Sequence, residues 1–195
     1  MTQRPYLNLG CGRIVLPGTK PAHYGLIDDA VCAYPLWHNV DRNAEPGVDE
    51  VVDIFRYPFP WADNSFDGAL CAHIVEHIPH EIRTTAVPLA QHSHDEAWAL
   101  RSKLEQLQDG WYAFFAELHR VLTPGSIIHV LSPYAWSAGA VTDPTHTRLI
   151  TEHTFTHSMQ PDERSPFKYE TGGLNLEQVG ETRYTPTGLF MHLRV

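Results

Sequence analysis

The chain has 195 residues and a net charge of −9 at pH 7, from 14 Lys or Arg and 23 Asp or Glu residues. This length fits one domain with a sizeable core, and we expect a single domain over residues 1–195. The acidic balance argues against nucleic acid or an anionic membrane as partner, since both favour clustered Lys and Arg. Cys11, Cys32 and Cys71 cannot make a disulfide framework, and the N-terminus has no apolar leader. We therefore expect a cytoplasmic protein.

Short apolar runs predict strands in the first part of the chain, at 6–9, 37–40, 50–52 and 66–72. The first run ends at Gly10-Cys11-Gly12, the second at Asp41 and the third at Asp53. Strands that end in glycines or in an acid are typical of a parallel sheet whose carboxyl ends face a ligand. The fourth run is almost continuously apolar, as expected for a strand covered on both faces.

The second half of the chain continues the alternation of helix and strand. Residues 80–108 begin with a polar, histidine-rich stretch, and we interpret them as an insertion or lid. Apolar side chains at spacings of three and four predict helix over 95–122, which Pro124 stops. A buried strand at 126–131 follows, and the turn at 185–188 separates two final strands. The prediction is an α/β fold with a doubly wound, mostly parallel seven-stranded sheet and an antiparallel C-terminal edge hairpin.

The residues at the predicted strand ends suit a nucleotide-like ligand. A glycine loop lets the backbone approach a ligand closely. An acid after the second strand, here Asp41, is where such sites hold ribose hydroxyls. Asp53 could accept a hydrogen bond from an exocyclic amine while Ile54 and Phe55 enclose a flat ring. Each feature alone also fits an ordinary turn or strand end, and the prediction depends on all three occurring in this order.

Five segments together resemble the class I S-adenosylmethionine-dependent methyltransferases: LNLGCG, the VD at Asp41, VVDI, NSFDGALCAHIVEHI and ELHRVLTPGSIIHVLSP. The resemblance implies that the glycine loop passes under the methionine, Asp41 binds the ribose, Asp53 and Ile54 contact the adenine, and His73 lies near the sulfonium. The implied cofactor-binding residues are Asn8, Gly10, Cys11, Gly12, Asp41, Asp53, Ile54 and His73.

The chain departs from that family pattern around the glycine loop. Asn8 stands where the family usually has an acid, and Ile14 stands where it has a third glycine. Pro17-Gly18 and the proline-rich segment 19–36 come next. The helix that usually opens after the loop is therefore predicted to be short or missing.

The segment after the fifth strand is predicted to bind the acceptor. Tyr134 and Trp136 could supply flat apolar walls. DPTHTR, residues 143–148, resembles a loop that closes the acceptor side in small methyltransferases. His146 would then be the general base, oriented by Asp143, with Arg148 beside the acceptor. The alternative is that Asp143 caps a turn and Arg148 pairs with it.

A competing motif occupies residues 73–77, His-Ile-Val-Glu-His, which matches the H-x-x-E-H pattern of inverted zinc peptidases. Two histidines four apart on a helix could bind zinc, with Glu76 as the base. However, the motif directly follows a buried strand, Pro79 ends any helix, and no third ligand is specified. We therefore predict no metal, and take His77 as the second choice for a general base.

The predicted function is methyl transfer from S-adenosylmethionine to a small-molecule or glycan-type acceptor. A non-catalytic binding module on the same fold is the main alternative, because of Asn8, Ile14 and the missing helix. A zinc hydrolase is less favoured. A nicotinamide-dependent oxidoreductase would need a third glycine at position 15, where the chain has Val15.

Overall fold

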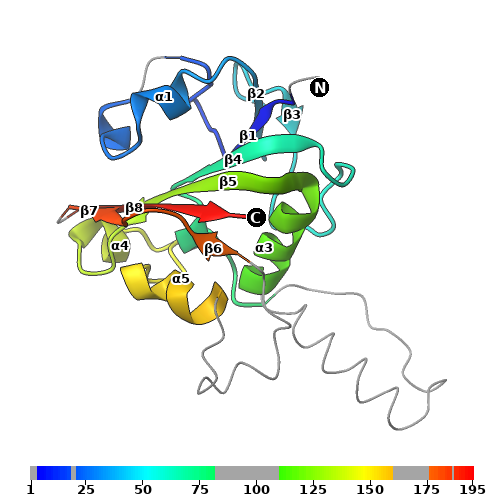
Figure 1. Cartoon of the computed structure of the whole chain (residues 1–195). Coiled ribbons are helices and arrows are strands. Elements are labelled where there is room, and N and C mark those ends of the chain that lie inside the picture. The colour runs from blue at the N-terminus through cyan, green and yellow to red at the C-terminus, as the bar shows by residue number, and fades with distance from the viewer. Residues whose placement is uncertain (1–3, 19–20, 82–109, 160–175, 186) are drawn as a thin grey trace, which may run out of the picture.

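The computed structural model describes residues 4–18, 21–81, 110–159, 176–185 and 187–195 (Figure 1). Nearly all of the predicted insertion at 80–108, and the predicted helix before residue 110, lie outside these residues. Within them, no helix combines the length and the apolar character that crossing a bilayer requires.

Eight strands of the described chain form one sheet. The parallel part consists of β1 (Tyr6–Leu9), β2 (Trp37–Asp41), β3 (Glu50–Val51), β4 (Phe66–Ala72) and β5 (Leu122–Pro133). β8 (Gly188–Arg194) pairs antiparallel with β5, and β6 (Glu177–Gln178) and β7 (Arg183–Tyr184) pair antiparallel with β8. The order is β3-β2-β1-β4-β5-β8-β6, with β7 also paired to β8. The predicted mostly parallel sheet with its antiparallel C-terminal edge is confirmed.

The order of strands along the chain reverses between β1 and β4. From β1 the chain goes outward to β2 and β3, and then returns to the other side of β1 as β4 and β5. Connections leave in opposite directions at such a point, so a crevice opens at the carboxyl ends of the two central strands. This topology places the predicted glycine loop and the segment after β4 at the same crevice.

The fifth strand is longer than the sequence predicts. Helix α3 (Gly110–Val121) is followed at once by β5, which begins at Leu122 rather than at Ser126. Leu122 pairs with Phe66 of β4, and the far end of β5 pairs with β8 as far as Pro133. Pairing with two neighbouring strands therefore extends β5 beyond its apolar run, an effect that the local pattern does not contain.

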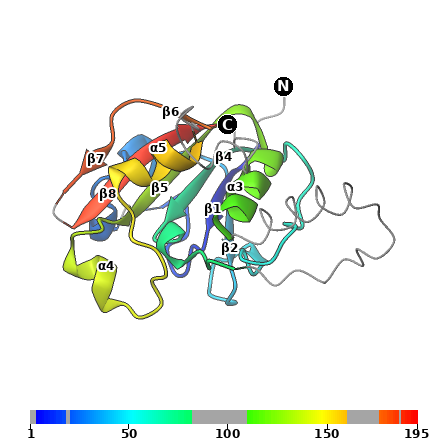
Figure 2. The ribbon, with the colours of Figure 1, turned by 90° about the horizontal axis from the view of Figure 1, so that it is seen from below.

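The two faces of the sheet are covered by different kinds of structure. On one face, α3 and α5 (Glu152–Met159) pack Trp111, Phe114, Phe115 and Phe155 over the strands. The other face is covered by residues 14–18 and 21–34, and the helical elements of these described residues are the 3₁₀ turn Ala22–Tyr24 and the four-residue α1 (Asp29–Cys32). Figures 1 and 2 show these layers on opposite sides of the sheet. The predicted loss of the helix after the glycine loop is confirmed in the described part of 10–36.

Candidate functional site

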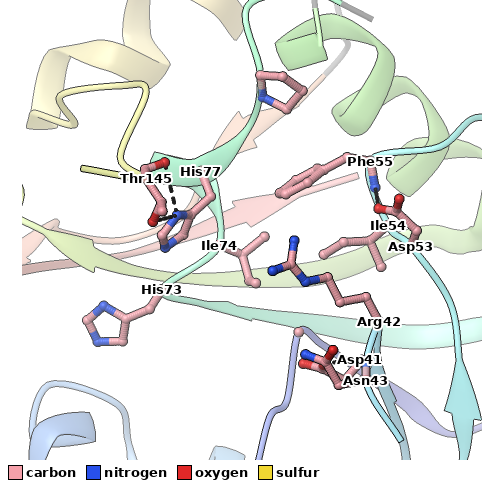
Figure 3. Close-up of a pocket in the computed structure, with 12 residues that line it drawn as sticks. Asp41, Arg42, Asn43, Asp53, Ile54, Phe55, His73, Ile74, His77 and Thr145 are labelled. Atoms are coloured by element: carbon pink, nitrogen blue, oxygen red, sulfur yellow. Dashed lines mark hydrogen bonds between the residues drawn. The ribbon is translucent and has the colours of Figure 1, made fainter. Parts of the chain in front are cut away.

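A cavity of about 390 Å³ lies at the carboxyl ends of the central strands. Figure 3 shows side chains converging on it from the segments at the ends of β2, β3 and β4 and from a loop after β5, and Gly10, directly after β1, also lines it. Its volume lies within the range of small-molecule sites. The lining residues are Gly10, Asp41, Arg42, Asn43, Asp53, Ile54, Phe55, His73, Ile74, His77, Pro79 and Thr145.

The glycine loop approaches the opposite side of the cavity closely. Gly10 has φ +60°, and a Cβ atom built there would overlap the Ile74 side chain. Gly12 has φ +51°, and its N–H donates to Asp41 Oδ2 at 2.9 Å. Cys11 is buried, and its burial and the nearby Asp41 raise the pKa of its thiol to about 11. Of the loop, Gly10 lines the cavity, while Cys11 and Gly12 hold its shape.

Asp41 supports the loop and also faces the cavity. Its Oδ2 accepts from Gly12 and its Oδ1 accepts from the Asn43 N–H at 2.8 Å. A carboxylate has about four acceptor positions. Positions therefore remain on Asp41 for ligand hydroxyl groups, although the carboxylate is mostly buried.

Asn8 lies behind the loop and is not among the described residues that line the cavity. Its amide Nδ2 donates to the Ile14 carbonyl and to Asn39 Oδ1, both at 2.9 Å. Asn39 in turn donates to the Leu16 carbonyl at 2.8 Å and accepts from the Leu16 N–H. A carboxylate at position 8 could not donate these bonds, so Asn8 suits the irregular chain that replaces the usual helix.

The ends of β2 and β3 supply a further side of the cavity. Asp53 Oδ1 accepts from the Phe55 N–H at 3.2 Å, and Asp53 Oδ2 lies 3.2 Å from Arg56 Nε. Ile54 is buried, and Phe55 packs against the core beside it. Arg42 points from the end of β2 toward the cavity (Figure 3). The sequence prediction missed Arg42, whose only signal was its place directly after Asp41.

His73 stands directly after β4 in a left-handed conformation, with φ +57°. Its N–H donates to the Leu131 carbonyl of β5 at 2.7 Å, which holds the strained residue in place. Its ring lies 5.9 Å from the ring of His23 and 6.3 Å from that of Tyr24. The disfavoured alternative, a helix that carries both His73 and His77, does not form, because the chain turns at His73 and then makes only the 3₁₀ turn Val75–His77.

The segment after β4 is bound to the loop after β5 by several hydrogen bonds. The N–H groups of Thr147 and Arg148 donate to the Glu76 carbonyl at 2.8 and 3.1 Å. Thr147 Oγ1 donates to the Ile78 carbonyl at 2.7 Å, and Arg148 donates to the carbonyls of Ile78 and Pro79 at 2.9 and 3.1 Å. Arg148, predicted to contact the acceptor, therefore fixes the loop instead of lining the cavity.

The two predicted general bases occupy different positions. His77 lines the cavity, and its Nδ1 lies 3.1 Å from Thr145 Oγ1 and 3.3 Å from the Thr145 carbonyl oxygen. The His146 ring packs against it at 4.7 Å, behind the cavity surface. Asp143 caps the turn by accepting from the N–H and the hydroxyl of Thr145. Its Oδ2 is 3.8 Å from His146 Nε2.

The predicted aromatic walls do not line the cavity within the described chain. Tyr134 forms an isolated bridge with Ile150 and packs at the edge of the core. Trp136 is 80% exposed. Thr145 and Pro79 line this side instead. The hydrogen bonds between residues 76–79 and 145–148 decide that outcome, and no local pattern in the sequence shows them.

No protein-family profile matches the chain, and no curated protein sequence matches it. Among solved structures, an S-adenosylmethionine-dependent methyltransferase from Archaeoglobus fulgidus is 15% identical, with a TM-score of 0.53 over 99% of this chain and 86% of that one. The cyclase SpnF is 15% identical, with a TM-score of 0.49 over 98% of this chain and 74% of that one. A 16S rRNA adenine methyltransferase from Catenulisporales acidiphilia is 13% identical, with a TM-score of 0.44, covering 98% and 84%.

The likeness to the Archaeoglobus structure is one of fold, at an identity too low to carry over a substrate. Together with the sheet order and the glycine loop, this likeness defines the fold of the chain. The protein has the class I methyltransferase fold.

Proposed function

We propose that this protein is a cytoplasmic S-adenosylmethionine-dependent methyltransferase that acts on a small-molecule or glycan-type acceptor. One observation carries the proposal. Gly10, Asp41, Asp53 and Ile54, which come from the ends of three different predicted strands, line one cavity at the point where the strand order reverses. Such a crevice is where open α/β sheets bind nucleotide-like ligands.

In this proposal each side of the cavity takes one part of the cofactor. The methionine part passes over Gly10, where a side chain would collide with Ile74. The free acceptor positions of Asp41 receive the ribose hydroxyls. Asp53 accepts from the adenine amine while Ile54 and Phe55 contact the ring. The cofactor supplies an activated methyl group on a sulfonium, so positioning carries most of the catalysis.

On the acceptor side, the protein has to orient one nucleophilic atom toward the methyl group and remove its proton if it carries one. The acceptor atom forms the new bond to carbon, and the electrons of the broken C–S bond stay on sulfur. His77 lines the cavity and His146 lies behind it. His77 is therefore the imidazole that an acceptor proton would reach.

Isothermal titration of the purified chain with S-adenosylmethionine, with its demethylated product and with NAD tests this proposal. We expect micromolar binding of the first two and none of NAD. If the chain binds neither S-adenosylmethionine nor its demethylated product, the proposal is wrong.

A non-catalytic cofactor-binding module remains the second candidate, because Asn8 and the irregular residues 14–18 and 21–28 depart from the usual loop and helix. Binding of S-adenosylmethionine with no methyl transfer to a panel of hydroxyl, amine and glycan acceptors would favour this candidate. Release of labelled methyl groups to any acceptor on the panel would exclude it.

A further inference from the structure

A buried carboxylate faces two imidazoles behind the acceptor side of the cavity. Glu76, His77 and His146, here called the Glu76 cluster, each offer a ligand atom, and these atoms all lie within 4.8 Å of one another. The Glu76 residue is 2% exposed, and neither carboxylate oxygen has a hydrogen-bond partner in the described part of the chain. A buried charge without a partner costs several kcal/mol in general, so this arrangement calls for a cation.

The proton on each imidazole can be assigned from its neighbours. Thr145 Oγ1 donates its one proton to Asp143 Oδ1 at 2.6 Å, so toward His77 it can only accept. The Thr145 carbonyl oxygen also only accepts, and His77 Nδ1 therefore carries the proton. His146 Nδ1 lies 3.1 Å from the Ala140 carbonyl oxygen and is protonated for the same reason. In this tautomer the Nε2 atom of each ring carries the lone pair that can bind a ligand.

This is the pattern of metal-binding histidines. Such residues usually donate the second ring N–H to a carbonyl or carboxylate, which fixes the ring and its tautomer. Here a backbone carbonyl holds each ring, and Asp143 reaches His77 through Thr145. The backbone bonds from Thr147 and Arg148 to the Glu76 carbonyl fix the two segments to each other. The cluster is therefore organised before any ion binds.

His73 does not complete the charge balance at Glu76. Its Nδ1 lies 3.3 Å from Glu76 Oε1 without forming a hydrogen bond, and the contact is an ion pair only when the His73 ring is protonated. The His73 ring is also more exposed than Glu76 and lies toward His23 and Tyr24. The H-x-x-E-H motif thus contributes Glu76 and His77, while the second histidine comes from 69 positions further along the chain.

We propose that Glu76, His77 and His146 bind one divalent transition-metal ion, with Zn²⁺ as the preferred ion. Two imidazole nitrogens and one carboxylate are the ligand set of open zinc sites, which keep a further position free. Mg²⁺ and Ca²⁺ prefer oxygen ligands and are disfavoured here. His77 and its partner Thr145 line the cavity, so an ion held by this cluster would border the space assigned to the acceptor.

If the proposed methyltransferase function holds, the ion could also activate the acceptor. An acceptor hydroxyl bound to the ion would release its proton to solvent water more readily, because a bound metal lowers the pKa of its ligand. His77 would then act as a metal ligand, and no free imidazole base would be needed. Metal binding itself does not depend on this step or on S-adenosylmethionine.

The test is a competition titration of the chelator-treated full chain with Zn²⁺ and a chromophoric chelator, with Mg²⁺ in parallel. We expect one equivalent of tightly bound Zn²⁺ and no competition from millimolar Mg²⁺. Glu76→Gln and His146→Gln remove ligands from the two different segments. Each should weaken binding by at least about 100-fold, because loss even of an outer-shell partner typically costs roughly 10–100-fold. His119→Gln, which removes an exposed histidine of α3, should bind like the unaltered chain.

Circular dichroism of each variant shows whether it remains folded, and the two ligand variants give independent answers if one does not. Absence of Zn²⁺ binding, unchanged affinity in both folded variants, or preference for Mg²⁺ would each overturn the proposal. A parallel titration with S-adenosylmethionine separates the two ideas. Zinc binding without cofactor binding would support the metal site and contradict the proposed methyltransferase function, and the reverse result would do the opposite.

Discussion

The cavity has two walls of different character. The strand-end wall, formed by Gly10, Asp41 and residues 53–55, has acidic groups that already accept hydrogen bonds from nearby backbone N–H groups. The loop wall, formed by residues 73–79 and Thr145, is backed by Glu76, whose carboxylate has no hydrogen bond in the described chain. The first wall is thus complete before a ligand arrives, whereas the second lacks a cation. We infer that the two walls bind chemically different ligands.

The largest effect on cofactor affinity is expected when a bulky side chain replaces Gly10 in the strand-end wall. Gly10→Val places a branched side chain at φ +60° against Ile74. We expect S-adenosylmethionine affinity to fall by at least about 100-fold, equivalent to about 2.8 kcal/mol, in isothermal titration. Gly139→Ala is the matched control, because its new Cβ would make only ordinary contacts. If both variants bind S-adenosylmethionine with the same affinity, Gly10 is not part of the cofactor site.

Asp41 tests whether the strand-end wall depends on its internal hydrogen bonds. Asp41→Ala leaves the N–H groups of Gly12 and Asn43 without their acceptor. We expect the free energy of unfolding to fall by about 1–3 kcal/mol, because partly buried donors lose their partners. Cofactor binding should be lost as well. Urea unfolding and titration measure both effects, and Asp41→Asn, which keeps one carbonyl acceptor, should be the more stable variant.

Thr147→Val tests the bond between the two segments of the loop wall. The substitution removes the hydroxyl that donates to the Ile78 carbonyl at 2.7 Å. We expect a loss of about 1 kcal/mol in the free energy of unfolding, the usual value for one hydrogen bond. Affinity for S-adenosylmethionine should change little, since the strand-end wall is untouched. A large loss of cofactor affinity would show that the two walls are coupled.

A change in pH acts at a site remote from both walls, and protonation of that site should leave ligand binding to the walls unaffected. Burial lowers the pKa of His129 to about 4, and its Nδ1 lies 2.9 Å from Nδ1 of His192. Burial and the nearby Arg183 also lower the pKa of His192. Between about pH 6.5 and pH 4 the unfolded chain therefore binds more protons than the folded one.

The stability contribution of the neutral His129 is complete above about pH 6.5 and is lost as the pH falls toward 4. We expect a decrease of about 1 kcal/mol per pH unit in this window, measured by urea unfolding. His129→Gln should flatten the slope. An unchanged slope would mean that other groups cause the loss of stability in acid. Ligand binding to the two walls should be compared above pH 7, where this loss does not occur.

The strand-end wall could be predicted from the sequence because its residues follow directly after apolar runs. Parallel strands bring their carboxyl ends to one edge, so Gly10, Asp41 and Asp53 needed only the strand order to meet. The roles of Asn8 and Arg148 could not be predicted in this way. Both act through hydrogen bonds to backbone atoms of distant segments, and the residue type does not reveal such partners.

By itself the sequence determined the class of fold, the glycine loop and the acids at the strand ends, because apolar periodicity and chain order are local properties. Only the tertiary structure decided that His77 reaches the cavity while His146 lies behind it, and that Trp136 stays exposed. It also decided that Glu76 and His146 meet. That contact depends on how a loop after β5 folds back onto the segment after β4, through hydrogen bonds that span about 70 residues.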